Sequence, residues 1–182
     1  MVLDFKIFPQ LQTERLILRN IESTDAELIH KLRSDEVVNR FVGRDNSSTV
    51  EKAKEFILKI QNLVAKNEGL YWIIRLKENN DLIGSVCLWN FDPENEIVEI
   101  GYEMLPEFQG KGIMTEALKA VTKHTFEEIK AKIITAFPSE DNVNSVAILK
   151  KMNFEFEDKK YNNTHENVNN IATYTLRNRT LI

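Results

Sequence analysis

The chain has 182 residues, 42% of them apolar and 29% charged, which is enough to bury a core and suits one domain, so we expect residues 1–182 to form a single domain. The formal net charge is −4 and no Lys/Arg run exceeds two residues, which argues against nucleic acid as a partner. Cys87 is the single cysteine, so an internal disulfide is excluded. With three histidines in addition, the chain has few residues for a zinc cluster.

The N-terminal segment has no features of a targeting signal. Residues 1–10 contain the acidic Asp4 and only short apolar runs, whereas a signal peptide starts with basic residues and continues into a long apolar stretch. No later segment approaches the about 20 apolar residues that a membrane span needs. We therefore expect a soluble, cytoplasmic protein with no bound metal and no membrane partner.

The first part of the chain predicts one strand followed by two helices. Apolar and polar residues nearly alternate over residues 15–21, which indicates a strand with one better-buried face. The second helix should end near Asn67, because Asn tolerates the left-handed conformation that closes a helix. Two capping-box patterns predict where the helices begin: Thr24 with Glu27, and Ser48 with Glu51.

The middle of the chain predicts three antiparallel strands. Turn-forming residues at 78–81 and 92–95 separate the strands and are too few for a crossover helix, so we expect a meander. The predicted strands are Leu70 to Lys77, Leu82 to Phe91, and Glu96 to Leu105.

The last part of the chain alternates between helical and strand periods. The resulting fold class is α/β, a mixed sheet with helices on both faces. The segments are a helix from Ala117 to Ile129, a buried strand from Ile133 to Phe137, a helix from Val143 to Asn153, and a hairpin of Phe154 to Tyr161 with Ile171 to Arg177.

The loop between the third strand of the meander and the next helix contains two glycines around Lys111. Gly110 and Gly112 allow backbone N–H groups to converge at a helix start, where a phosphate can bind. The loop is not a Walker A motif, because Gly112 follows Lys111 where Ser or Thr is required. On glycine content alone, an ordinary strand-to-helix turn is the better interpretation.

Longer motifs favour the phosphate interpretation. The segment Gln109 to Met114 resembles the pyrophosphate motif of the GNAT acetyltransferase superfamily, Gln/Arg-x-x-Gly-x-Gly/Ala, although Met114 replaces the usual small residue. Leu11 to Arg19 resembles the opening strand of the RimJ/RimL-like branch, which acetylates ribosomal-protein N-termini. Asp141 to Ser145 and Lys151 to Phe154 resemble its Asn-x-x-Ser and Lys-x-Gly-Phe signatures, with Asn153 in the glycine position.

The resemblance implies a GNAT-like fold with acetyl-CoA as cosubstrate. The strands ending at Leu105 and Phe137 would run parallel and splay apart around the pantetheine arm. Backbone groups of Met104 and Leu105 would bind that arm as an added strand does, and Asn142 would hold it from the other side. The expected pyrophosphate-loop residues are Gln109, Gly110, Lys111, Gly112, Ile113, Met114 and Thr115.

Direct acetyl transfer needs a base for the incoming ammonium and an acid for the departing thiolate. Glu99 and Glu103 fall on one face of the predicted strand, on either side of Gly101, and either could be the base. Glu99 is preferred because it matches the Glu-x-Gly-Tyr pattern of the branch. The structural alternative for both carboxylates is a solvated strand face or a salt bridge.

Ser145 is the candidate acid, as the resemblance implies. Many family members place a tyrosine on the last helix, but Leu149 stands at that position. The structural alternative for Ser145 is a capping hydroxyl in the first turn of its helix.

The predicted function is an N-acetyltransferase that moves an acetyl group from acetyl-CoA to a primary amine by direct transfer in a ternary complex. The branch suggests a protein N-terminus as the acceptor, and polyamines or antibiotics remain alternatives. A further alternative is a regulatory module that binds acyl-CoA without turnover. The sequence leaves a monomer and a homodimer equally open.

Overall fold

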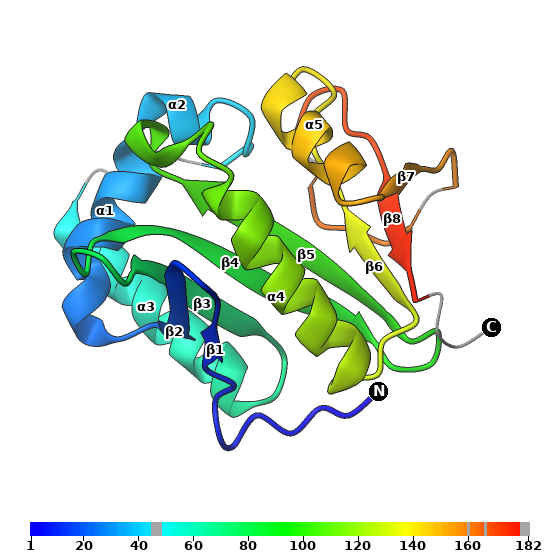
Figure 1. Cartoon of the computed structure of the whole chain (residues 1–182), viewed down its shortest axis with the longest axis horizontal. Coiled ribbons are helices and arrows are strands. Elements are labelled where there is room, and N and C mark those ends of the chain that lie inside the picture. Colours follow the sequence, from blue (N-terminus) through cyan, green and yellow to red (C-terminus); the bar gives the residue numbers. More distant parts are fainter. Residues whose placement is uncertain (45–48, 160, 166, 179–182) are drawn as a thin grey trace.

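A computed structural model describes residues 1–44, 49–159, 161–165 and 167–178 (Figure 1). Eight strands form one sheet in the order β1-β2-β3-β4-β5-β6-β8-β7. β5 and β6 are parallel, and the other neighbouring strands are antiparallel. The strands are β1 (Leu11–Gln12), β2 (Leu16–Asn20), β3 (Leu70–Leu76), β4 (Leu82–Asp92), β5 (Ile97–Met104), β6 (Ile133–Ala136), β7 (Glu155–Phe156) and β8 (Tyr174–Arg177).

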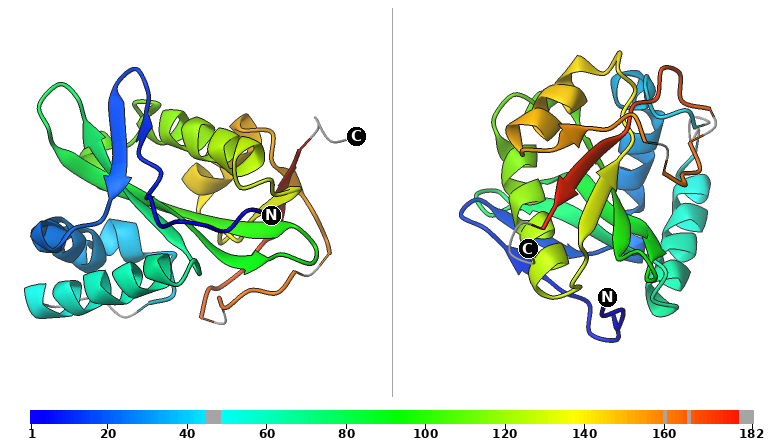
Figure 2. Two further views of the ribbon diagram at one scale, coloured as in Figure 1. Left: turned by 90° about the horizontal axis from the view of Figure 1, so that it is seen from below. Right: turned by 90° about the vertical axis from the view of Figure 1, so that its right-hand side faces the viewer.

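Helices cover both faces of the sheet, as the sequence predicts. α4 packs on one face, whereas α1 and α3 lie on the opposite face (Figure 2). The helices are α1 (Ala26–Ser34), α2 (Glu36–Asn39), α3 (Val50–Ala65), α4 (Ile113–Glu127) and α5 (Val143–Lys151), with 3-10 turns at Ser23–Asp25 and Pro106–Phe108. The predicted mixed α/β sheet is therefore confirmed.

Burial follows the predicted patterns of the strands. In β2, Leu16 and Leu18 are fully buried and Ile17 is only half-buried, which is the one better-buried face that the alternation predicts. β3, β4 and β5 form the expected antiparallel meander. The terminal hairpin also forms, although its strands are shorter than predicted.

Both helix ends that were predicted at asparagines are confirmed. Asn67 follows α3 with a φ of 59°, and Asn153 follows α5 with a φ of 61°. Both residues adopt the left-handed conformation, which Asn tolerates better than most residues. After Asn153, the Phe154 N–H donates to Leu149 O at 3.0 Å and the ring is buried, so the chain packs back onto α5.

The capping box predicted at Thr24 and Glu27 is wrong, and the one predicted at Ser48 and Glu51 begins at a residue outside the described ranges. Before α1, Glu22 N–H donates to Asp25 Oδ2 at 2.8 Å, and Arg19 pairs with the same carboxylate at 2.6 Å. This buried ion pair draws Asp25 into the turn in place of Thr24 and Glu27. At α3 the cap is Thr49, whose hydroxyl accepts from Lys52 N at 3.2 Å, and Ser48 lies outside the described residues.

Candidate active site

The parallel pairing of β5 and β6 stops partway along β5. The register runs from Ile97 opposite Ile133 to Glu99 opposite Thr135, whereas β5 continues to Met104. On its other edge β5 stays paired with β4 as far as Met104. Beyond Glu99, the backbone groups of β5 that point away from β4 have no described strand beside them. This is the splayed strand pair that the resemblance implies.

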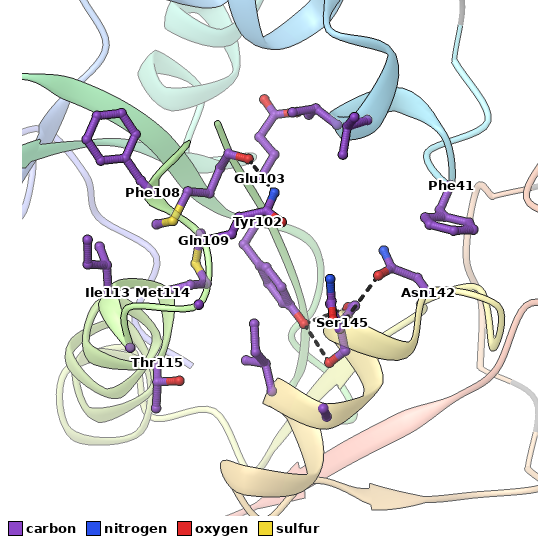
Figure 3. A pocket seen from close by; sticks show the side chains of 18 of the residues that line it. Phe41, Tyr102, Glu103, Phe108, Gln109, Ile113, Met114, Thr115, Asn142 and Ser145 are labelled. Carbon is purple, nitrogen blue, oxygen red and sulfur yellow. Dashed lines mark hydrogen bonds between the residues drawn. The ribbon is translucent and has the colours of Figure 1, made fainter. Parts of the chain in front are cut away.

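A cavity of about 450 Å³ lies beside the end of β5, between the starts of α4 and α5 (Figure 3). Its walls come from α2 and the following loop, the end of β5, the first turn of α4, and the first turns of α5. Glu99, Leu105 and Lys111 do not belong to the described lining. The predicted site residues that line it are Glu103, Met104, Gln109, Gly110, Gly112, Ile113, Met114, Thr115, Asn142 and Ser145.

The glycine loop presents backbone donors to this cavity. Gly110 and Gly112 have φ values of 74° and 72°, a left-handed conformation that glycine adopts without steric cost. Gly112 directly precedes α4, so the first N–H groups of the helix have no intrahelical acceptor. A Cβ added at Gly110 would meet no atom within 4 Å. The loop therefore leaves room for an anion at the positive end of the α4 dipole.

The Gln109 side chain holds the loop against β5. Its Nε2 donates to Met104 O at 2.9 Å, so in this structure the amide braces the loop itself. Met104 O is on the open edge of β5, because the neighbouring Leu105 N–H donates toward β4, to Ile83 O at 3.0 Å. Met104 and Leu105 were both expected to bind pantetheine through their backbone groups, but only Met104 has its backbone on the open edge of β5.

Arg15 is a second brace, which the sequence analysis did not identify. Its Nη1 donates to Lys111 O at 3.1 Å, and its Nε donates to Glu116 Oε2 at 2.6 Å. Thr13 Oγ1 also donates to Glu116, at 2.5 Å. These bonds tie the segment between β1 and β2 to the start of α4. The pairing joins residues about a hundred positions apart, which no local pattern reveals.

Ser145 and Tyr102 share a hydrogen bond inside the cavity (Figure 3). The two hydroxyl oxygens are 2.8 Å apart. Asn142 Oδ1 accepts from Ser145 N at 3.1 Å, so Asn142 caps α5 and the interpretation of Ser145 as the cap is wrong. Burial raises the pKa of Tyr102 above its ordinary value, so this phenol keeps its proton near neutral pH. Tyr102 was missed as a site residue, although it ends the Glu-x-Gly-Tyr pattern.

Glu103 has a complete set of partners at the cavity wall. Arg44 Nη2 pairs with it at 2.7 Å, and the hydroxyls of Tyr71 and Ser85 donate to it at 3.1 and 3.3 Å. Burial raises the pKa of Tyr71 well above its ordinary value, so this phenol remains a donor. Glu103 therefore forms the salt bridge that was the structural alternative to a role as the base.

Glu99 projects from the same face of β5 as Glu103 and is deeply buried, with 2% of its surface exposed. Asn90 Nδ2 donates to its Oε2 at 2.7 Å, and His165 Nε2 contacts its Oε1. The solvated-face alternative is therefore wrong for Glu99. His165 comes from the connection between β7 and β8, and sequence spacing gives no signal of this contact.

Within residues 1–44, 49–159, 161–165 and 167–178, no three or more His, Cys, Asp or Glu side chains gather in a way that could hold a metal ion. No helix in the same ranges has the length and apolar character to cross a membrane.

Comparisons with known proteins agree with this geometry. Residues 15–155 match the family described as "Acetyltransferase (GNAT) domain". The uncharacterized N-acetyltransferase YoaA of Bacillus subtilis (strain 168) is 33% identical over 151 residues, covering 83% of this chain and 85% of that protein. The putative ribosomal N-acetyltransferase YdaF of the same bacterium is 27% identical, covering 80% of this chain and 81% of that protein.

Solved structures share the fold along almost the whole chain. A GNAT-family acetyltransferase from Bacillus anthracis superposes with a TM-score of 0.78 at 25% identity, covering 93% of this chain and 98% of that chain. A putative ribosomal-protein-serine acetyltransferase from Vibrio cholerae reaches a TM-score of 0.82 at 21% identity, covering 94% and 98%. The family match, the sequence relatives and the splayed strand pair together show that the chain belongs to the GNAT family and is an acetyltransferase.

Proposed function

We propose that this acetyltransferase binds acetyl-CoA in the cavity beside the end of β5, between the starts of α4 and α5, and passes the acetyl group directly to a primary amine. The observation that carries the proposal is the shared cavity: the glycine loop at the start of α4, the open edge of β5 and the Ser145 hydroxyl all face it. A solved structure of the same fold, 18% identical with a TM-score of 0.76, is described as RimL in complex with Coenzyme A.

The cosubstrate would lie along backbone groups. The pyrophosphate accepts hydrogen bonds from the N–H groups of Gly112, Ile113, Met114 and Thr115, where the helix dipole favours negative charge. The pantetheine arm pairs with the open edge of β5 at Met104. Leu105 has no such role, because its N–H already serves Ile83.

The transfer itself requires two proton movements. Glu99 accepts a proton from the acceptor ammonium, the freed nitrogen pair attacks the thioester carbonyl carbon, and the C–S bond breaks as the C–N bond forms. The thiolate takes the proton of Ser145, whose oxygen accepts a hydrogen bond from the Tyr102 hydroxyl across the 2.8 Å contact. The second proton shed by the new amide nitrogen returns to Ser145 through water, so both hydroxyls are protonated at the end of the turnover. Both reactants are held at once, so no covalent enzyme intermediate forms.

The ion pair at Glu103 makes it the weaker candidate for the base. Protonating Glu103 would leave the half-buried Arg44 guanidinium without its carboxylate, which is costly. Glu99 has neutral Asn90 and the titratable His165 as partners, so it can take a proton without stranding a fixed charge. Glu103 remains the alternative because it lines the cavity itself.

The acceptor amine would enter beside α2. The cavity wall there is apolar and is formed by Val37, Val38, Phe41 and Val42. Two relatives are named a putative ribosomal N-acetyltransferase and a ribosomal-protein-serine acetyltransferase, and RimL is described as a ribosomal L7/L12 alpha-N-protein acetyltransferase. One neighbour of the same fold is instead described as a microcin C7 self-immunity acetyltransferase. We propose a protein N-terminus as the acceptor, and small-molecule amines are the alternative outcome of the test.

The test is thiol release from acetyl-CoA with a panel of amines: peptides with free N-termini, spermidine, an aminoglycoside and free amino acids. Turnover on a peptide supports the full proposal. Turnover on a small amine alone would show that the acceptor is a small molecule and not a protein N-terminus. Tight acetyl-CoA binding without release on any amine would identify a non-catalytic module.

Glu99→Gln and Glu103→Gln variants separate the two candidate bases. A general base contributes about 10²- to 10⁴-fold in rate, so Glu99→Gln should lower kcat by that range with acetyl-CoA affinity kept. The deficit should shrink at high pH, where more of the amine is already deprotonated. A change of only a few-fold would transfer the role to Glu103, and normal turnover in both variants would refute a carboxylate base.

A further inference from the structure

The carboxylate of Glu99 is buried without a permanently charged partner. Within the described residues its one ion-pair partner is His165, and Asn90 supplies a neutral hydrogen bond. A buried carboxylate is costly unless it is paired or shares a proton. Among the described residues, the imidazole of His165 is therefore the one partner of Glu99 that can carry a positive charge.

His165 connects this buried carboxylate with the outside of the protein. Its side chain is 22% exposed, whereas that of Glu99 is 3% exposed. The ring lies between two aromatic neighbours, with centroids 5.8 Å from Phe137 and 6.4 Å from Trp89. One ring nitrogen thus meets Glu99 while part of the ring reaches solvent.

The connection that carries His165 makes a local turn and then approaches the loop after α2. Asn163 Oδ1 accepts from the His165 backbone N–H at 3.0 Å. Further along, Asn167 O approaches the loop after α2 so closely that a Cβ at Gly43 would lie 2.6 Å from it. The connection that carries the imidazole therefore runs beside the loop that follows α2.

We propose that His165 is a positioning residue that fixes the Glu99 carboxylate and passes the proton taken from the acceptor amine to solvent. The inference rests on the proposed function, with Glu99 as the base. The proton leaves the ammonium nitrogen for Glu99, moves from the carboxyl oxygen to His165 Nε2, and is released to water from the other ring nitrogen. Glu99 returns to the carboxylate for the next turnover.

The other titratable groups on this face of the sheet cannot substitute for His165. Burial raises the pKa of the Cys87 thiol well above its ordinary value, so Cys87 holds its proton. Glu103 is neutralised by Arg44 at 2.7 Å. Thr135, opposite Glu99 on β6, donates its hydroxyl to Val98 O at 3.4 Å and does not titrate in water.

An unpaired donor beside the pair provides a link toward the amine. Trp89 Nε1 is buried without a hydrogen-bond partner among the described residues. Its ring lies over Gly101, where an added Cβ would be 3.3 Å from Cζ2, between Glu99 and Glu103. A water that bonds to this indole N–H can bridge an amine in the cavity to the Glu99 carboxylate.

The experiment compares His165→Ala, His165→Gln and wild type, using acetyl-CoA and the amine from the panel with the fastest thiol release. His165→Gln keeps a donor for the carboxylate but cannot carry a proton. Both variants should lose about 10- to 100-fold in kcat, with KM for acetyl-CoA within about two-fold of wild type, because a proton-transfer step typically contributes at least this much. Added imidazole should restore His165→Ala and not His165→Gln, in which the side chain fills the space.

Asn162→Ala is the matched control, since it changes the same connection three residues earlier and should turn over as wild type. Wild-type kcat in His165→Gln, or no rescue of His165→Ala by imidazole, would overturn the relay. Trp89→Phe should lower kcat several-fold while keeping the ring, and an unchanged kcat would remove the bridging water. If wild type releases no thiol, the proposed function itself fails. If Glu99→Gln is silent, the base role moves to Glu103 and the relay fails with it, so each failure is distinguishable from a failure of the relay alone.

Discussion

A serine hydroxyl is a weak acid, and in the role proposed for Ser145 the contact with Tyr102 would help it to protonate a thiolate. The phenol can donate to Ser145 Oγ across 2.8 Å, which leaves the serine proton directed at the sulfur. We expect Ser145→Ala to lower kcat by about 10²-fold or more while KM for acetyl-CoA changes little, because the negative charge on sulfur develops only in the transition state. Steady-state kinetics with acetyl-CoA and the best amine measure both constants.

Tyr102→Phe is the informative partner of that variant. If the two hydroxyls act as one unit, the double variant should be no slower than Ser145→Ala alone. Because Asn142 Oδ1 provides the α5 cap, Ser145→Ala should lower the thermal midpoint only by what the lost bond to Tyr102 contributes. An unchanged kcat in Ser145→Ala would mean that solvent protonates the thiolate.

At the scale of elements, we expect the N-terminus of α4 to bind the pyrophosphate of acetyl-CoA. Gly112→Asp places a carboxylate where the pyrophosphate approaches the helix N-terminus, and should abolish acetyl-CoA binding measured by isothermal titration. The chain should still fold, because the Cβ would meet only Arg15 Nη2 at 3.8 Å and Asp tolerates positive φ.

Gly112→Asn is the matched control for the Gly112→Asp variant. It has nearly the same shape and an equal tolerance of the left-handed conformation, without the charge. It should therefore weaken acetyl-CoA binding far less than Asp does. Wild-type affinity in Gly112→Asp would refute the pyrophosphate assignment, and equal losses in both variants would attribute the effect to the side-chain volume.

Elements with a strong period or a stop residue were predictable from the sequence. The meander strands and the helix ends at Asn67 and Asn153 follow from hydrophobic alternation and from the conformational tolerance of Asn. α2 was not predicted, because a helix of four residues is too short to show a period. The cap of α3 shifted to Thr49 because Ser and Thr compete for the same role at adjacent positions.

At the scale of the whole molecule, the missed site residues are those fixed by long-range contacts. Glu99 and His165 are 66 positions apart, and Arg44 and Glu103 are 59 apart. The glycine loop and Ser145 could be named from local sequence motifs, because the geometry of each depends on residues adjacent in the chain. Only the tertiary fold determines that Glu103 pairs with Arg44 and that Glu99 pairs with His165.

The buried ionisable side chains make the folded chain sensitive to alkali. Burial raises the pKa of Tyr71, Cys87 and Tyr102 in the folded state, so each keeps its proton while the unfolded chain loses it at about pH 8.5 for Cys and about pH 10 for Tyr. Their contribution to the free energy of unfolding is complete below those values, and it falls as pH rises toward the folded pKa. The thermal midpoint should therefore be flat from pH 7 to about pH 8 and decline steadily above about pH 9.

The Tyr102→Phe variant tests whether buried phenols cause that decline. Surface lysines lose their charge equally in both proteins, so the difference between the two pH curves isolates the phenol. Phe lacks an ionisable group, so the variant should lose less of its midpoint between pH 9 and pH 11 than wild type, even if its midpoint at pH 7 is lower for want of the bond to Ser145. Circular dichroism melts at matched ionic strength give both curves. Parallel curves over this range would show that Tyr102 ionises as readily in the folded chain as in the unfolded one, which contradicts its burial beside Ser145.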